Sequence, residues 1–368
     1  MVLPIIYRQE LREYDFGPGH PFRGDRYEEF PDFLRQKLAE GVDFEFVAAA
    51  PAGDDDLALI CRPDYVDFCR RYYGAASLGQ ERPPEEHRYL SPDNIPPGRP
   101  GRLEEAARLI IGQAKKAADL LVEGASSRVV ALGGGMHHAR EAFGEGFCIY
   151  NDVAFCARYL TQQHGLERVM VIDTDAHAGN GTAGYFYDDP SVLLVDLHQD
   201  PRSLYPGTGF ADQTGAGEGK GYTVNVPMPL FSGDESYRLV FEEIVRPLAA
   251  EYRPQVIIRN GGSDPHCADE LTSLGMQVSG FRMLGEQVRG LAELCGARQI
   301  DLIGSGYNRQ VLPWAWLALI TGLLGLELPL EEPCPAPAWL GVDRSLSLMR
   351  GIIQQVKNNL KDYWACLR

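Results

Sequence analysis

Short apolar segments recur along this 368-residue chain, and helical patterns lie between many of them. The apolar segments have the length of buried strands and cover residues 3–7, 44–48, 129–132, 169–172, 192–196, 256–258 and 302–303. Good helix formers cover residues 103–123, 151–163, 235–252, 282–295 and 343–364. Alternating strands and helices favour a mostly parallel sheet with helices on both faces. Because no linker clearly divides the chain, we predict an α/β fold with a single domain over residues 1–368.

Polar residues with acid–base chemistry follow several of these apolar segments or lie in glycine-containing turns. Side chains at the carboxyl ends of parallel strands meet in one crevice, and open α/β sheets bind their ligands there. We therefore expect the following residues to form one site: His137, His138, Asp173, Asp175, His177, Asp264 and Tyr307.

Three of these residues form a candidate metal site. Asp175 and His177 are two positions apart, which places both side chains on one face of a regular strand. With Asp264 they offer an O, N, O ligand set, and three protein ligands leave a position open for water and substrate. This arrangement is typical of a catalytic zinc site, although iron or cobalt also accept such ligands. Taken alone, an Asp-x-His is more commonly a turn-capping carboxylate beside a buried histidine.

The composition argues against several classes of protein. The net charge is −16, whereas a surface that binds duplex DNA needs clustered Lys and Arg, so we expect no direct nucleic-acid contact. The eight cysteines include no Cys-x-x-Cys motif, which is typical of a reduced cytoplasmic protein. The first residues lack the pattern of a signal peptide. The apolar stretch 312–330 contains a glutamate and two prolines, so we interpret it as a buried helix and turn and expect no membrane segment.

Five segments of the chain resemble the histone deacetylase family, the zinc-dependent deacylases of the arginase-deacetylase fold. They are GGGMHHAREAFGEGFCIYND (133–152), VIDTDAHAGNGT (171–182), LYPGTG (204–209), NGGSDPHCADELTSLGM (260–276) and GSGYN (304–308). DTDAH and FYDDP are similar to bacterial acetoin-utilisation-type members, and HAGNG is similar to class II and class IV members. The resemblance implies the arginase-deacetylase fold and one zinc ion per chain.

The resemblance also implies the roles of the catalytic residues. It makes His138 the general base and then the general acid, and His137 a more electrostatic partner. Asp173 then orients His137, and Asn180 orients His138 where some relatives have Asp. The hydroxyl group of Tyr307 donates a hydrogen bond to the amide oxygen as that oxygen becomes an oxyanion.

A narrow channel for the stem of an acylated amine follows from the same resemblance. Phe147, which follows Gly146, matches one wall, and Tyr205 matches the facing wall. Asp93 matches a rim aspartate that binds peptide backbone. Met276 or Leu274 lines the pocket mouth. The resemblance further implies structural potassium near the metal ligands, at a place where this chain has Asp196 and relatives commonly have Ser.

Three functions remain open at this stage. The leading one is hydrolysis that removes acyl groups, above all acetyl, from the ε-amino group of lysine in proteins or peptides. A second is deacetylation of a polyamine, for which Glu85 and Glu86 could attract an ammonium group. A third, of another class, is a non-catalytic acyl-lysine-binding or scaffold protein. The sequence does not define the oligomeric state.

Overall fold

The chain is described by a computed structural model over residues 2–338, 340, 343 and 345–368. These residues form two compact units, which we describe separately. Unit 1 comprises Met1–Gly165 and Asp301–Gly304, and unit 2 comprises Leu166–Ile300 and Ser305–Arg368.

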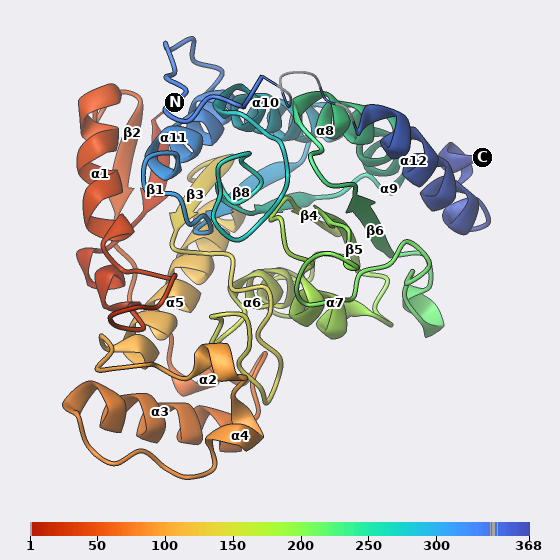
Figure 1. Ribbon diagram of the computed structural model, residues 1–368. Helices are drawn as coiled ribbons and strands as arrows, with labels where there is room; N and C mark the ends of the chain where they lie inside the picture. Colours follow the sequence, from red (N-terminus) through yellow and green to blue (C-terminus); the bar gives the residue numbers. More distant parts are fainter. Residues whose placement is uncertain (1, 339, 341–342, 344) are drawn as a thin grey trace. The chain divides into compact units, whose positions relative to one another are not determined.

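The strands form one eight-stranded sheet in the order β2-β1-β3-β8-β7-β4-β5-β6 (Figure 1). In unit 1, β1 pairs in parallel with both β2 and β3. In unit 2, β4 pairs in parallel with β5 and β7, and β5 pairs in parallel with β6. The predicted parallel α/β sheet is therefore confirmed. The strands are β1 (Leu3–Ile6), β2 (Phe44–Val47), β3 (Arg128–Leu132), β4 (Val169–Asp173), β5 (Val192–Gln199), β6 (Thr223–Met228), β7 (Val256–Asn260) and β8 (Arg298–Ile303).

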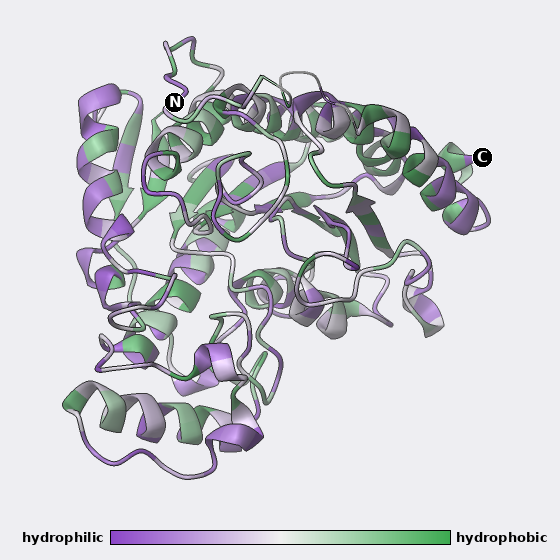
Figure 2. Ribbon diagram, in the orientation of Figure 1, coloured by the Kyte–Doolittle hydropathy of each residue, from purple (hydrophilic) through white to green (hydrophobic). Residues whose placement is uncertain are grey.

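Helix α5 (Leu103–Val122) lies within the helix predicted over 103–123 and contributes to the core of unit 1, because most of its apolar side chains are buried. Helix α3 instead has alternating hydrophilic and hydrophobic bands, as Figure 2 shows. The proline-rich segment 78–101 contains the short helix α4 (Glu86–Tyr89) and a 3-10 turn. The other helices of unit 1 are α1 (Arg26–Lys37), α2 (Asp54–Leu57), α3 (Pro63–Leu78) and α6 (Asp152–Arg158).

The helices of unit 2 lie on both sides of its strands. In the view of Figure 1, α7 lies below β4, β5 and β6, and α8 and α12 lie above them. The helix predicted over 235–252 consists of α8 and α9 joined by a π-helical turn at Phe241–Val245. The helices are α7 (Asn180–Phe186), α8 (Asp234–Val240), α9 (Arg246–Tyr252), α10 (Val278–Cys295), α11 (Leu312–Leu324) and α12 (Leu346–Leu360).

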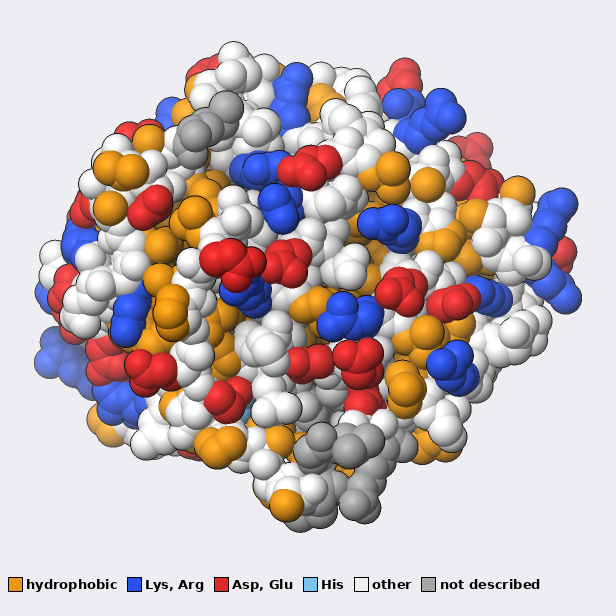
Figure 3. Space-filling model, turned by 90° about the horizontal axis from the view of Figure 1, so that it is seen from above, with side chains coloured by type: hydrophobic (Ala, Val, Ile, Leu, Met, Phe, Trp, Pro, Cys, Tyr) orange, Lys and Arg blue, Asp and Glu red, His pale blue; other side chains and the backbone are white. Residues whose placement is uncertain are grey.

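Helix α11 corresponds to the apolar stretch that raised the question of a membrane span. It has 13 residues, and almost all of them are buried inside unit 2. Among the described residues, no helix is both long and apolar enough to cross a bilayer. Acidic, basic and apolar side chains are interspersed on the face drawn in Figure 3, so the surplus of acid is not gathered into one field there.

Two glycines allow α10 and α11 to approach each other closely. A Cβ atom on Gly285 would lie 2.4 Å from the carbonyl oxygen of Leu319, and one on Gly322 would lie 2.2 Å from the carbonyl oxygen of Arg282. Both neighbours are backbone atoms, so relief requires the helices to move apart.

We predict that Gly322→Ala lowers the free energy of unfolding by about 1–3 kcal/mol, because it overpacks this helix contact. Gly351→Ala is the matched control, since Gly351 also lies inside a helix but a Cβ there meets no atom within 4 Å. The control should be neutral or slightly stabilising, because Ala is the better helix former. Denaturant titration measures both variants, and equal stability of the two would contradict this account of the contact.

Candidate functional site

The three predicted metal ligands lie together in unit 2. Asp175 and His177 follow the end of β4, and Asp264 follows the end of β7. These neighbouring strands are parallel and in register, with Asp173 opposite Asn260, so both turns leave the sheet at one edge. One ligand atom from each of the three side chains can be chosen so that all lie within 4.8 Å of one another.

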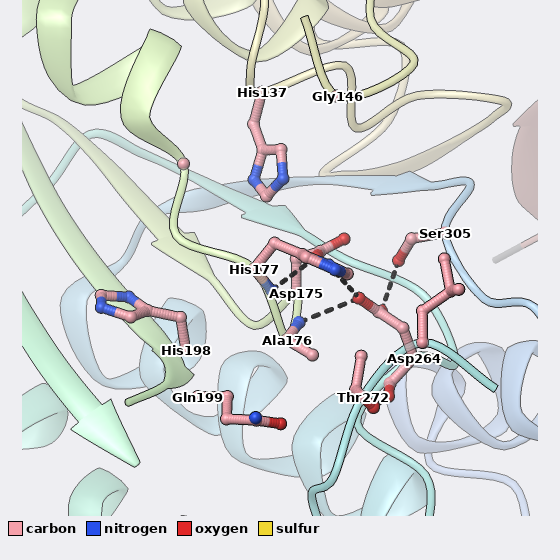
Figure 4. Close-up of polar contacts among 12 residues, drawn as sticks. His137, Gly146, Asp175, Ala176, His177, His198, Gln199, Asp264, Thr272 and Ser305 are labelled. Carbon is pink, nitrogen blue, oxygen red and sulfur yellow. Dashed lines mark hydrogen bonds and ion pairs between the residues drawn. The ribbon is translucent and has the colours of Figure 1, made fainter. Parts of the chain in front are cut away.

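Asp264 is fixed by hydrogen bonds that leave it facing His177 (Figure 4). The Ser305 hydroxyl donates to its Oδ1 atom at 2.7 Å, and the backbone N–H of Ala176 donates to its Oδ2 atom at 3.0 Å. His177 Nδ1 lies 3.2 Å from the same Oδ2 atom and 3.0 Å from Oδ1 of Asp175. The imidazole nitrogen therefore lies between two carboxylates.

The electrostatics of this group favour a bound cation. Burial, and after it the nearby charge of Asp175, raise the pKa of the Asp264 carboxyl to about 8. Burial alone would lower the pKa of His177, but hydrogen bonds and charges from the two carboxylates outweigh it and raise that pKa to about 10. The two carboxylates therefore favour positive charge beside them, which a metal ion bound at this group would supply.

The two predicted catalytic histidines lie together in unit 1. The ring centroids of His137 and His138 are 4.2 Å apart, and their Nε2 atoms are separated by 3.2 Å. At that distance one Nε2 carries the proton and the other accepts it. Two imidazolium charges this close would repel each other, so a charge on one ring acts directly on the other.

Asp152 holds the loop that carries these histidines, and sequence reasoning missed it. This first residue of α6 is fully buried. Its carboxylate accepts hydrogen bonds from the backbone N–H groups of Gly135 at 3.0 Å and Met136 at 2.7 Å. Burial raises the pKa of Asp152 to about 6. The sequence signals this role only by placing an acidic residue, Asp152, directly after GFCIYN at the start of a predicted helix.

Gly146 keeps room for the ring of His138. Its φ is +59°, and a Cβ atom there would lie 2.2 Å from Cδ2 of His138. The Asp93 carboxylate accepts a hydrogen bond from the Gly146 N–H at 3.0 Å. Asp93 was predicted to bind peptide backbone, and in this structure it binds the backbone of its own chain. Its role toward a substrate stays a prediction.

Phe147 belongs to an aromatic cluster within unit 1. Its ring lies 4.6 Å from the His20 ring and 6.4 Å from the rings of Phe16 and Phe22, measured between centroids. The Tyr14 hydroxyl donates to the Phe147 carbonyl at 2.6 Å. The cluster therefore fixes both the ring and the backbone of this predicted wall residue.

Tyr307 lies in a turn of unit 2 that a second buried carboxylate holds. The Tyr307 N–H donates to Asp269 Oδ2 at 2.8 Å, and the Leu271 N–H donates to Oδ1 of the same residue at 3.0 Å. Burial raises the pKa of Asp269 to about 6. Gly306 allows the turn, because its φ is +122° and a Cβ there would collide with the Ser263 hydroxyl. Sequence reasoning did not identify Asp269.

Asp173 and Asn180 are in unit 2, whereas the histidines that they were predicted to orient are in unit 1. Both pairings stay predictions. Within unit 2, both oxygens of the Asp173 carboxylate accept from the Asn260 side-chain amide at 3.0 Å. Asn180 is the first residue of α7 and is half-buried.

Three further predicted residues differ in exposure or in their bonding. Tyr205 is 42% exposed, as a wall residue at an open mouth could be, whereas Met276 is fully buried. Asp196 accepts from the Gly179 N–H at 2.8 Å and lies 2.7 Å from His198 Nδ1. Structural potassium at that place stays a prediction, as do the channel roles of Tyr205 and Met276.

Comparisons with known proteins identify the family and the fold. Residues 20–323 match the histone deacetylase domain family. A "Probable deacetylase" of Archaeoglobus fulgidus is 32% identical over 380 residues, covering 100% of both chains. The "Acetoin utilization protein AcuC" of Bacillus subtilis is 33% identical, covering 91% of this chain and 85% of that protein. The crystal structure of the HDA15 HD domain superimposes with a TM-score of 0.82 at 25% identity, covering 100% of this chain and 97% of that one. The structural match confirms the predicted arginase-deacetylase fold.

We predict that Gly146→Ala lowers kcat/KM for an acetylated substrate by roughly 100-fold, because a displacement of His138 by about 1 Å misaligns a reacting group. Metal content should not change, since the metal ligands lie elsewhere. Gly165→Ala is the control, because Gly165 has a similar φ of +67° but a Cβ there meets no atom within 4 Å. A comparable loss of activity in both variants would assign the effect to backbone strain instead.

We also predict that Asp269→Asn lowers kcat without lowering zinc content, because the amide replaces one acceptor of the two N–H bonds and releases the Tyr307 turn. Tyr307→Phe gives the largest loss of kcat that we expect from this turn, since removal of one oxyanion donor lowers kcat by roughly 100- to 1,000-fold. Asp269→Asn should reduce kcat less than Tyr307→Phe and have little further effect in the double variant. Fully additive losses would show that Asp269 does not act through Tyr307.

Proposed function

The chain belongs to the histone deacetylase family, and we propose that it is a zinc-dependent hydrolase that removes acetyl groups from the ε-amino group of lysine in peptides or proteins. That it is a deacetylase-type hydrolase follows from the family and from its deacetylase relatives. The choice of zinc, the lysine substrate and the catalytic residues are the proposal. The single observation that carries it is the buried group of Asp175, His177 and Asp264.

These three residues suit a zinc ion in donor chemistry, spacing and charge. One imidazole nitrogen and two carboxylate oxygens are ligands that zinc accepts, and three protein ligands are typical of a catalytic site. The raised pKa of His177, about 10, reflects two carboxylates that attract positive charge against the effect of burial. When bound, zinc supplies Lewis-acid chemistry that polarises a carbonyl group and makes water more acidic.

The histidine pair is proposed to move the protons of the reaction. His138 takes a proton from the attacking water and later gives it to the leaving amine, which is general base and then general acid catalysis. His137 stabilises the charge that His138 gains. The 3.2 Å contact between the two Nε2 atoms supports a joint role, because a charge gained by one ring acts directly on the other.

Tyr307 is proposed to stabilise the oxyanion. Its hydroxyl donates a hydrogen bond to the amide oxygen as negative charge develops there. The Asp269 carboxylate holds the Tyr307 backbone at 2.8 Å, so the turn is fixed before the substrate binds. Such preorganisation is what makes a hydrogen-bond donor effective in the transition state.

We predict that Asp264→Asn loses zinc and activity together, because the variant keeps the shape of the side chain but removes one negatively charged ligand. Since changes outside the ligand shell already cost 10- to 100-fold in metal affinity or activity, this loss should be at least about 100-fold. Asp67→Asn is the control, as Asp67 is an exposed carboxylate paired with Arg71. A folded Asp264→Asn protein with full zinc content, measured by mass spectrometry of the metal, would remove Asp264 from the ligand set.

A substrate panel on the zinc-loaded protein tests the proposed substrate class. We expect a higher kcat/KM for acetyl-lysine peptides than for acetylputrescine. A preference for acetylputrescine would make the protein an acetylpolyamine deacetylase and would contradict the lysine assignment. Stoichiometric zinc without turnover of any acylated amine would indicate a non-catalytic binding protein.

A further inference from the structure

A cavity of about 450 Å³ in unit 2 is lined by three arginines, Arg168, Arg253 and Arg298, and none of the described residues that line it is acidic. The chain as a whole is acidic, with a net charge of −16, whereas this cavity has a basic lining. The remaining lining residues are Leu166, Pro254, Gln255, Val256, Cys295 and Gly296. A cavity of this size falls in the range of small-molecule sites, about 300–1,000 Å³.

The cavity lies at the amino-terminal edge of the strands, where Val169 begins β4, Val256 begins β7 and Arg298 begins β8. The metal-binding residues follow the opposite ends of β4 and β7. Five strand residues at roughly 3.3 Å each separate the two edges by about 16 Å. A ligand in this cavity is therefore distinct from the substrate at the metal site.

Backbone hydrogen bonds fix the wall of the cavity. The side-chain oxygen of Gln255 accepts from the N–H groups of Glu167 at 2.9 Å and Arg168 at 3.1 Å. The Gln255 N–H donates to the Arg168 carbonyl at 2.8 Å, and the Arg298 N–H donates to the Gln255 carbonyl at 3.1 Å. The Gln255 side chain thus joins the segment of Arg168 to the segment that carries Arg253.

The arginine side chains are partly ordered by the same wall. Arg168 Nε donates to the carbonyl oxygen of Arg253 at 3.0 Å, which orients the guanidinium plane. Arg168 Nη1 lies 3.4 Å from Glu167, whose side chain is 82% exposed. Such an exposed pair contributes little and is readily exchanged for a better anion. Arg253 ends α9 in the left-handed conformation, with a φ of +52°.

We propose that this cavity binds a small phosphorylated molecule of nucleotide size. Guanidinium groups bind phosphate through paired, charge-assisted hydrogen bonds, which is the recognition that three arginines offer best. The apolar lining from Leu166, Pro254, Val256 and Cys295 gives the non-phosphate part of such a ligand a surface to pack against. A bare inorganic anion would use only the arginines.

The test measures binding of ADP, pyrophosphate, adenosine and succinate to the full-length protein by isothermal titration calorimetry without divalent cations. We expect ADP to bind most tightly, pyrophosphate more weakly, and adenosine and succinate weakest. Arg253→Gln and Arg298→Gln should each lower ADP affinity by about 10- to 100-fold, as expected for the loss of charge-assisted hydrogen bonds. Arg238→Gln is the control, since Arg238 lies on α8 and pairs with Glu235.

Several outcomes would overturn the proposal. Adenosine that binds as tightly as ADP, or succinate that binds more tightly than ADP, would contradict recognition of phosphate. An ADP affinity that is unchanged in both arginine variants would contradict the site. An oligonucleotide that binds more tightly than ADP, with an affinity that rises with its length, would indicate a nucleic-acid surface. The inference does not rest on the proposed deacetylase reaction. Binding of ADP to the folded Asp264→Asn protein keeps the two questions separate, because that variant loses the metal site and retains the cavity.

Discussion

The in-register pairing of β4 with β7 is the constraint on which the candidate metal site depends. Asp173 lies opposite Asn260 where both strands end, and the Asn260 side chain donates to both oxygens of Asp173. The N–H and hydroxyl groups of Thr174 also donate to the Asn260 carbonyl. These bonds fix the relative position of the two turns, so Asp175 and Asp264 face one histidine. A slip of one residue would turn every side chain of the strand to the other face.

That arrangement places charge where folding disfavours it. Asp175 and Asp264 are 3% and 0% exposed, and the pKa of Asp264 is raised to about 8 mainly by its burial. Buried charges without compensation are strongly destabilising. The Ser305 hydroxyl and the Ala176 N–H compensate part of the Asp264 charge, and the proposed metal ion would compensate the rest. Metal affinity and folding stability would then be coupled in this unit, because a ligand that binds only the folded state stabilises it.

The sequence predicted the residues that bear chemistry better than the residues that hold them in place. Asp175 and His177 form a local spacing pattern, and the apolar segments before them mark the strand. Asp152 and Asp269 form no such pattern, because a carboxylate that binds backbone N–H groups can lie at any separation from them. β8 was predicted only at 302–303 because Arg298, Gln299 and Asp301 interrupt its apolar character, although all but Arg298 are buried. The arginine cavity combines positions 168, 253 and 298, which only the fold brings together.

Asp152 and Asp269 show how buried anions can act on structure and leave the chemistry to other residues. Each has its pKa raised to about 6 by burial, and each carboxylate accepts hydrogen bonds from two backbone N–H groups. The donors are Gly135 and Met136 for Asp152, and Leu271 and Tyr307 for Asp269. Those N–H groups would otherwise be buried without partners, which costs free energy comparable to a lost hydrogen bond. One carboxylate therefore satisfies two amides at once and fixes a turn that no helix or strand supports. The loops of His137 and Tyr307 are held in this way through their backbones.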